Sequence, residues 1–101
     1  MKESSPRSAL DKVLHQPIRT QITAYLASHG EATFTDLKNV LGLTDGNLDA
    51  HMKKLIQTGY IVSRKEGDAV RPQTFYTLSS EGKSAFDAYV KDLSNILGIS
   101  T

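Results

Sequence analysis

Hydrophobic residues recur with helical spacing over three segments in the first part of the chain. These segments run from Pro17 to His29, from Thr35 to Leu41 and from Asp45 to Thr58. Each is followed directly by a glycine, as is common where a helix ends. A short opening helix is also predicted upstream, from the apolar residues Ala9, Leu10, Val13 and Leu14.

Residues with a side-chain oxygen stand where several of the predicted helices begin. We expect Thr35, Thr44 and Ser79 to cap helices, because such an oxygen can accept a free backbone N–H at a helix start. Ser79 would begin a final helix over residues 80–97. Pro17 suits the first turn of its own helix, where a missing N–H removes no hydrogen bond.

Two later segments, residues 60–65 and 74–78, alternate apolar and polar side chains as β-strands do, and a polar loop at 66–73 separates them. Residues 32–34 can add a brief strand. A short helix, a Gly-containing turn, a second helix and a hairpin predict a winged helix-turn-helix. The expected fold class is mainly α (α+β), with about five helices and a two- to three-stranded antiparallel β wing.

The helical segment 45–58 has two different faces. The side predicted to face the core holds Leu48, Met52, Leu55 and Ile56. The opposite side presents Gly46, Asn47, Ala50, Lys53, Lys54 and Gln57. Small residues permit close approach, an asparagine amide can bind adenine, and lysine can reach guanine or phosphate. An ordinary solvated helix face has a similar composition, so it is the neighbouring turn and wing that favour contact with DNA.

The loop between the two predicted strands would form the tip of the wing. Arg71 is placed where a hairpin tip can enter the minor groove, a usual position for an inserted arginine. Arg64 lies near the end of the incoming strand, close to where a phosphate backbone would run. Glu66 and Asp68 favour the alternative, a charged tip that only keeps the hairpin soluble.

Composition fits one small domain, because 101 residues with 39% apolar content can bury a single core. Twelve Lys and Arg against eleven Asp and Glu give a net charge of +1, so attraction to DNA must come from how the charge is distributed. We expect a flexible arm over residues 1–7 and one domain over residues 8–97. Without a long apolar run or a secretory leader, we expect a cytoplasmic protein with no membrane contact.

The sequence offers little for metal or catalytic chemistry. It has no cysteine, and His15, His29 and His51 lack the spacing of a zinc site. No nucleophile stands at motif spacing from a base, and no glycine loop suits a phosphate. We therefore expect no metal, no cofactor and no enzymatic activity.

The final helix carries an apolar stripe that is longer than one small core needs. We expect Phe86 and Val90 to close the chain's own core, and the rest to pack against a second subunit in a homodimer. The predicted dimer interface consists of Leu10, Leu14, Tyr89, Leu93, Ile96 and Leu97. The alternative is that the whole stripe closes the core of one chain.

Three segments together resemble the compact winged-helix transcriptional regulators of bacteria and archaea that are related to the MarR and ArsR families. They are HQPIRTQITAYL, FTDLKNVLGLTDGNLDAHMKKLIQTGYIVSRKE and RPQTFYTLSSEGKSAFDAYV. The resemblance covers residues 9–93 and implies a homodimer that binds a pseudo-palindromic operator, usually as a repressor. It also implies DNA contacts at Thr44, Asn47, Ala50, His51, Lys53, Lys54, Arg64 and Arg71. The chain lacks the cysteine ligands of ArsR-type metal sensors and the longer terminal helices of MarR-type proteins.

Two functions are compatible with this sequence. The first is a homodimeric regulator whose partners are double-stranded DNA and a second copy of itself. The alternative is a winged-helix module that binds another protein, because one fold hosts unrelated functions. Exposed Lys53, Lys54 and Arg71 without a large apolar patch would favour DNA, and so would a steep loss of binding with salt.

Overall fold

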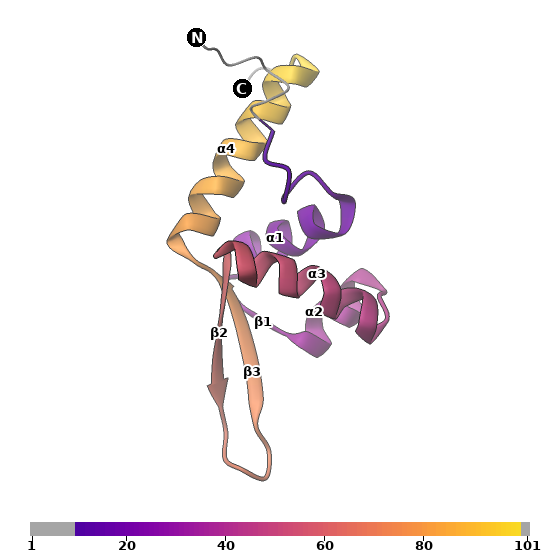
Figure 1. Ribbon diagram of the computed structural model, residues 1–101, viewed down its shortest axis with the longest axis vertical. Coiled ribbons are helices and arrows are strands. Elements are labelled where there is room, and N and C mark those ends of the chain that lie inside the picture. Colours follow the sequence, from indigo (N-terminus) through magenta and orange to yellow (C-terminus); the bar gives the residue numbers. More distant parts are fainter. Residues whose placement is uncertain (1–9, 100–101) are drawn as a thin grey trace.

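The computed structural model of the protein describes residues 10–99, which form four helices and a three-stranded antiparallel sheet of order β1-β3-β2 (Figure 1). In chain order the elements are α1 (Pro17–His29), β1 (Ala32–Thr33), α2 (Phe34–Leu41), α3 (Asp45–Thr58), β2 (Ile61–Glu66), β3 (Gln73–Leu78) and α4 (Ser80–Leu97). The predicted winged helix-turn-helix is confirmed, but with four helices in place of about five. The expected arm at residues 1–7 lies outside the described residues.

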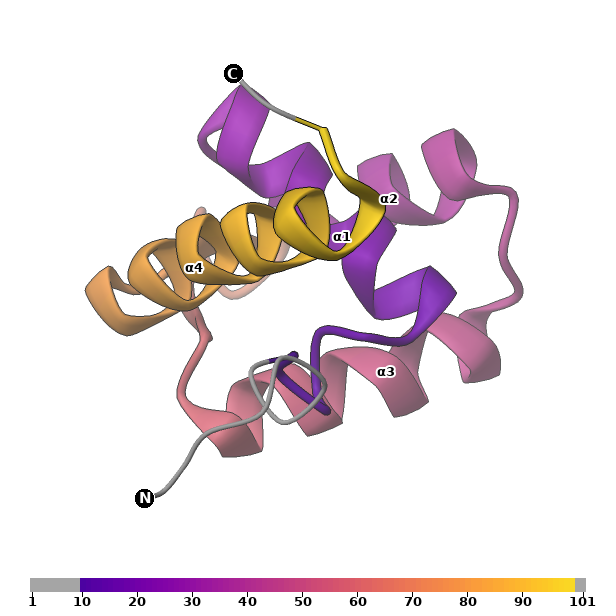
Figure 2. The same cartoon turned by 90° about the horizontal axis from the view of Figure 1, so that it is seen from above.

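The core lies where the helices meet the base of the sheet. Helix α1 packs against the other three helices and against β3, and Figure 2 shows these helices gathered around it. The buried apolar side chains include Ile22, Leu26, Leu37, Leu48, Leu55, Ile61 and Leu78. Ile56 was expected in this core but is 41% exposed. It lies roughly 80° around the helix from Leu48, at about 100° per residue, and so falls at the edge of the buried face.

The opening helix predicted upstream of Pro17 does not form, which accounts for the smaller number of helices. Residues 11–15 make a turn instead. Asp11 Oδ1 accepts the backbone N–H groups of Val13 (2.8 Å) and Leu14 (3.1 Å), so a side chain takes the place of helical hydrogen bonds. Gln16 is extended (φ −150°, ψ 127°), as the residue before a proline prefers.

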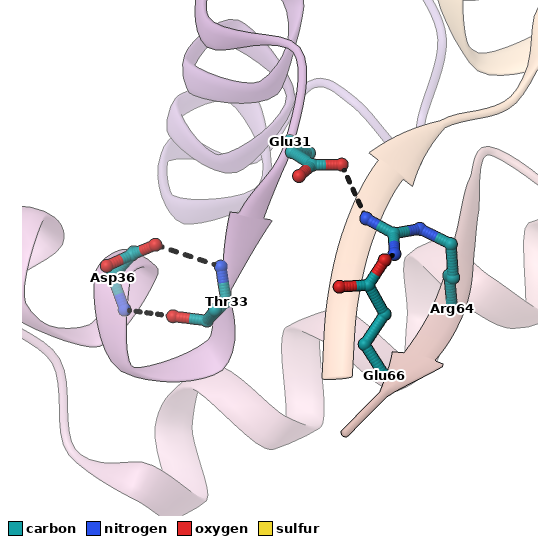
Figure 3. A network of polar contacts seen from close by, with 5 residues as sticks. All are labelled: Glu31, Thr33, Asp36, Arg64 and Glu66. Atoms are coloured by element: carbon teal, nitrogen blue, oxygen red, sulfur yellow. Dashed lines mark hydrogen bonds and ion pairs between the residues drawn. The ribbon is translucent and has the colours of Figure 1, made fainter. Parts of the chain in front are cut away.

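The helix caps agree with the sequence at two of three positions. Thr44 and Ser79 cap α3 and α4, each accepting the N–H three residues on, at 3.2 and 2.9 Å. The prediction that Thr35 caps α2 is wrong, because Thr33 does so in a reciprocal capping box with Asp36 (Figure 3). The Asp36 N–H donates to Thr33 Oγ1 at 3.0 Å, and the Thr33 N–H donates to Asp36 Oδ2 at 3.1 Å.

The end of α3 and the start of α4 are joined through their backbones. Ser79 donates its N–H to the Tyr60 carbonyl (2.9 Å) and its hydroxyl to the Gly59 carbonyl (2.6 Å). Gly82 lies against the same Tyr60 carbonyl, since a Cβ at this position would be 2.1 Å from the Tyr60 oxygen. This α3–α4 junction, made by residues 59, 60, 79 and 82, therefore requires a residue without a side chain in α4.

Tyr60 also fixes the segment that precedes α1. Its hydroxyl donates to Asp11 Oδ2 at 2.5 Å. This hydrogen bond, together with burial and the negative charges of Asp11 and Glu81, raises the pKa of Tyr60 to about 12. The turn at residues 11–15 is thus attached to the point where α3 gives way to the wing.

Candidate nucleic-acid interface

The turn between α2 and α3 is fixed by backbone geometry and by charge. Gly42 adopts the left-handed conformation (φ 66°), and its N–H donates to the Lys38 carbonyl. The Lys38 ammonium contacts the Asp45 carboxylate at 2.9 Å, from one helix to the next. Asp45 also lies in the first turn of α3, where a negative charge complements the positive end of the helix dipole. These contacts set the direction in which α3 leaves α2.

The outer face of α3 is open to solvent. Leu48, Met52 and Leu55 are buried on the opposite side. The exposed residues at the start of the helix and on its outer face are Thr44, Gly46, Asn47, Ala50, Lys53, Lys54 and Gln57. Apart from Ile56, the predicted division of this helix into a buried and an exposed side is confirmed.

The two lysines on this face have different surroundings. Lys53 Nζ lies 3.1 Å from the carboxylate of Asp49, one turn earlier. Both side chains are exposed, and such pairs contribute little and open readily. Within residues 10–99, Lys54 has no carboxylate at ion-pair distance. Among the described residues, the charge of Lys54 is therefore less balanced than that of Lys53.

His51 turns from the outer face of α3 toward α1. Its Nδ1 lies 3.3 Å from Nη1 of Arg19, whose Nε in turn donates to the Val13 carbonyl at 2.6 Å. Burial and the positive charge of Arg19 lower the pKa of His51 below its usual 6.5. The imidazole is therefore neutral at pH 7 and lies at the edge of the exposed face rather than in its centre.

The tip of the wing is closed by contacts between near neighbours. Gly67 has a φ of 89°, and a Cβ there would lie 2.3 Å from the Arg71 carbonyl oxygen. Asp68 Oδ1 accepts the backbone N–H groups of Arg71 (2.9 Å) and Val70 (3.0 Å), which lower the pKa of the Asp68 carboxyl. The Arg71 side chain is exposed, and with Thr35 at the start of α2 it borders a hollow of about 540 Å³.

Arg64, predicted to contact DNA, is held by two carboxylates of its own chain (Figure 3). Its Nη2 lies 3.0 Å from Glu31 Oε1, before β1, and its Nη1 contacts Glu66 at the end of β2. The guanidinium also lies over the ring of Phe75, 4.8 Å from its centroid. Arg64 and Phe75 are cross-strand partners in the hairpin, so the predicted strands contained a signal for this contact. The pairing with Glu31 had none, because that residue precedes the wing by more than thirty positions.

The second half of α4 extends beyond the other helices (Figure 1). Val90 was expected in the core, together with Phe86, but is 44% exposed. Phe86 is half-buried against the core, as predicted. Ile96 and Leu97 are 46% and 62% exposed, so these two predicted interface residues do stand on the surface.

Leu14 and Tyr89, predicted at a dimer interface, lie in the chain's own core at 0% and 4% exposure. The Tyr89 hydroxyl lies 2.9 Å from His15 Nδ1, which satisfies its polar end. Leu10 and Leu93 are half-buried against the same core. The apolar surface left on α4 and directly after its end, here called the α4 ridge, consists of Val90, Leu93, Ile96, Leu97 and Ile99.

Other kinds of site find no support in the part of the chain that the structure describes. Between residues 10 and 99, no three His, Asp or Glu side chains gather as a metal site would require. None of the helices in that range is long and apolar enough to cross a membrane.

Comparison with known proteins finds a matching family model, a related protein and similar solved structures. Residues 18–97 match a family model described as a winged helix DNA-binding domain. The "Uncharacterized protein MJ0432" of Methanocaldococcus jannaschii is 33% identical over 82 residues, which cover 81% of this chain and 89% of that protein. The structure of a transcriptional regulator homologue from Pyrococcus horikoshii OT3 has a TM-score of 0.79 at 29% identity, over 85% of each chain. HlyU from Vibrio cholerae N16961 has a TM-score of 0.67 at 27% identity, over 90% of each chain.

Proposed function

Because the chain belongs to the winged-helix DNA-binding domain family, we propose that it is a homodimeric, sequence-specific repressor that binds a pseudo-palindromic operator. The observation that carries this proposal is the exposed face of α3, with its small residues, one asparagine amide and two ammonium groups. We propose repression because the resemblance to the MarR and ArsR families implies it. The proposal also includes the predicted relation to the MarR and ArsR families and a location in the cytoplasm.

In this proposal α3 lies in the major groove, which is about 12 Å wide and admits a helix. Asn47, in the first turn, binds a base edge, and a bidentate contact of this kind contributes about 1–3 kcal/mol of discrimination. Lys53 and Lys54 bind phosphates. Thr44 and Ala50 add a hydroxyl and a methyl group at close range, while His51 adjoins the DNA at the edge of the face.

The wing takes the flanking minor groove, with Arg71 inserted there. Narrow minor grooves have an enhanced negative potential that attracts arginine. Arg64 would have to leave Glu31 and Glu66 before it could reach a phosphate. We therefore assign Arg64 a smaller part in binding than Arg71.

A second copy of the chain would cover the α4 ridge. Four of its five residues are exposed large apolar side chains, and three of them, at 96, 97 and 99, are clustered at one end. Exposed apolar surface of this kind is unfavourable in water and gains about 25 cal/mol per Å² on burial. A two-fold dimer would bury the same ridge on both subunits. Such symmetry would present two α3 helices to the two halves of an operator.

Selection of genomic DNA tests the proposal. Purified protein would be mixed with sheared DNA from its source organism, and the retained fragments would be sequenced. We expect fragments that share an inverted repeat, with half-sites about one helical turn, roughly 34–36 Å, apart or a multiple of it. Asn47→Ala should retain DNA without that repeat. Retained wild-type fragments that share no motif would contradict sequence-specific binding.

The salt dependence of binding separates DNA from a protein partner. Each phosphate contact contributes a slope of about −0.9 to the plot of log affinity against log salt concentration. Lys54→Ala should reduce the slope by about one contact. Lys83→Ala, which removes an exposed lysine from α4, is the matched control and should leave the slope unchanged. Wild-type protein that binds no DNA, or binds it independently of salt, would favour the protein-binding alternative.

A further inference from the structure

We propose that Asp68 is a positioning residue for DNA binding, because it holds the wing tip in the conformation that presents Arg71. The inference rests on the proposed role of the wing. A carboxylate at a DNA-facing tip is unfavourable for charge reasons alone, since it repels phosphate. Its place in the structure suggests the opposite contribution.

The Asp68 side chain replaces the missing ladder bonds at the end of the hairpin. The β2–β3 pairing ends at Glu66 and Gln73, which leaves residues 67–72 without strand partners. Asp68 Oδ1 accepts two N–H groups in this gap, those of Val70 and Arg71. One carboxylate oxygen therefore orders the backbone of the residue whose side chain would enter the minor groove.

The flanking residues restrict the same segment from both sides. Gly67 lets the chain fold back so closely that a Cβ at this position would lie 2.3 Å from the carbonyl oxygen of Arg71. Pro72 has a fixed φ, which limits the residue before it. Together with Asp68, these residues restrict the backbone on both sides of Val70 and Arg71, whose side chains are exposed, Val70 at 84%.

Preorganisation of this kind affects affinity because a loop ordered in advance loses less freedom on binding. Fixing the backbone of a single residue changes an equilibrium constant by about tenfold. Loss of the Asp68 acceptor should therefore weaken binding by about three- to tenfold relative to a variant that lacks the charge but keeps the acceptor. That sign distinguishes a positioning residue from one that only repels DNA.

The test compares Asp68→Asn with Asp68→Ala. Asparagine keeps an acceptor oxygen at the same place and can form the same turn without the charge, whereas alanine removes both. Affinity for mixed-sequence double-stranded DNA would be measured at several salt concentrations. We expect D68N to bind as well as wild type or a few times tighter, and D68A to bind about three- to tenfold more weakly than D68N. In an Arg71→Ala background the two variants should bind equally, because Asp68 acts through Arg71.

Hydrogen exchange of the free protein provides a readout that does not involve DNA. The backbone N–H groups of Val70 and Arg71 should exchange faster in D68A than in wild type, and D68N should restore protection. Equal exchange in all three proteins would overturn the proposal. So would equal DNA affinity of D68A and D68N, or a difference that persists without Arg71. If wild type does not bind DNA at all, the proposed function fails, and exchange alone decides whether Asp68 orders the tip.

Discussion

Gly82→Ala should destabilise the protein, although alanine is the better helix former. Propensity alone would make α4 more stable by up to about 1 kcal/mol. The added Cβ, however, would lie 2.1 Å from the Tyr60 carbonyl oxygen and 2.9 Å from its carbonyl carbon. Carbon and carbonyl oxygen normally approach no closer than about 3.3 Å. The two backbones would therefore have to separate by about 1 Å.

That separation acts on the hydrogen bonds of the α3–α4 junction. Ser79 bonds to Tyr60 at 2.9 Å and to Gly59 at 2.6 Å, and loss of one such bond costs about 1 kcal/mol. Overpacking of a close contact costs about 1–3 kcal/mol more. After the gain in propensity, we expect a net loss of about 1–3 kcal/mol in the free energy of unfolding. For a chain of this size the melting temperature should fall by roughly 5–20 °C.

Urea unfolding followed by far-ultraviolet circular dichroism, at one fixed protein concentration, measures this change. Gly46→Ala is the matched control, because Gly46 also lies in the first turn of a helix, but an added Cβ there would meet no atom within 4 Å apart from its chain neighbours and the backbone of its own helix. The control should be as stable as wild type or up to about 1 kcal/mol more stable. If Gly82→Ala were as stable as the control, the role assigned to the close contact would be wrong.

Three further predictions concern assembly and pH. Leu97→Asp should give a monomer in sedimentation, because it places a charge in the proposed apolar contact. Val62→Asp, at an exposed strand position, is the control and should leave the dimer intact. Wild-type protein that sediments as a monomer at tens of micromolar would refute the proposed dimer. The Tyr60 hydroxyl has a raised pKa, so the stability from its hydrogen bond to Asp11 is present below pH 10 and is lost as pH rises from about 10 to 12. In an absorbance titration, Tyr60→Phe should remove the tyrosine ionisation that occurs at the highest pH. The pKa of His51 is lowered, so the free energy of unfolding should fall as pH drops through 6.5. Chemical unfolding at pH 7 and pH 5 measures the difference in this free energy, which should be smaller in His51→Gln than in wild type.

Long, strongly patterned elements were predictable from the sequence. The bounds of α3 and α4 agree with the expected 45–58 and 80–97, because caps and apolar spacing coincide there. At α2 the sequence prediction named Thr35, two residues after the observed cap, Thr33. Thr33 prevails because Asp36 stands three residues later and completes the box, whereas Lys38 stands at that distance from Thr35.

Short elements and neighbouring side chains were less predictable. The opening helix failed because one carboxylate, Asp11, captures the amides that the helix would have used. On α4, Tyr89 and Val90 are adjacent and differ by about 100° around the axis, so both fit the apolar stripe. Which of them faces inward depends on where α4 meets the segment around His15, and that contact is not local in sequence.

The candidate site, too, could be predicted from the sequence only in part. The exposed face of α3 followed from angle alone, since its spacing is regular. Arg64 did not, because its ion pair with Glu31 joins the wing to a residue far back in the chain. Periodicity describes which side of one element is polar, but it does not describe which distant carboxylate will balance a charge.

The α3–α4 junction has a mechanical consequence for the proposed dimer. The helix that would join two subunits begins in direct contact with the residues that follow α3, the helix proposed to read DNA. A change in the angle between the two α4 helices of a dimer would therefore rotate both α3 helices as well. Strain at the ridge would then alter the distance between half-sites that the dimer accepts, while the bases read within each half-site stayed the same.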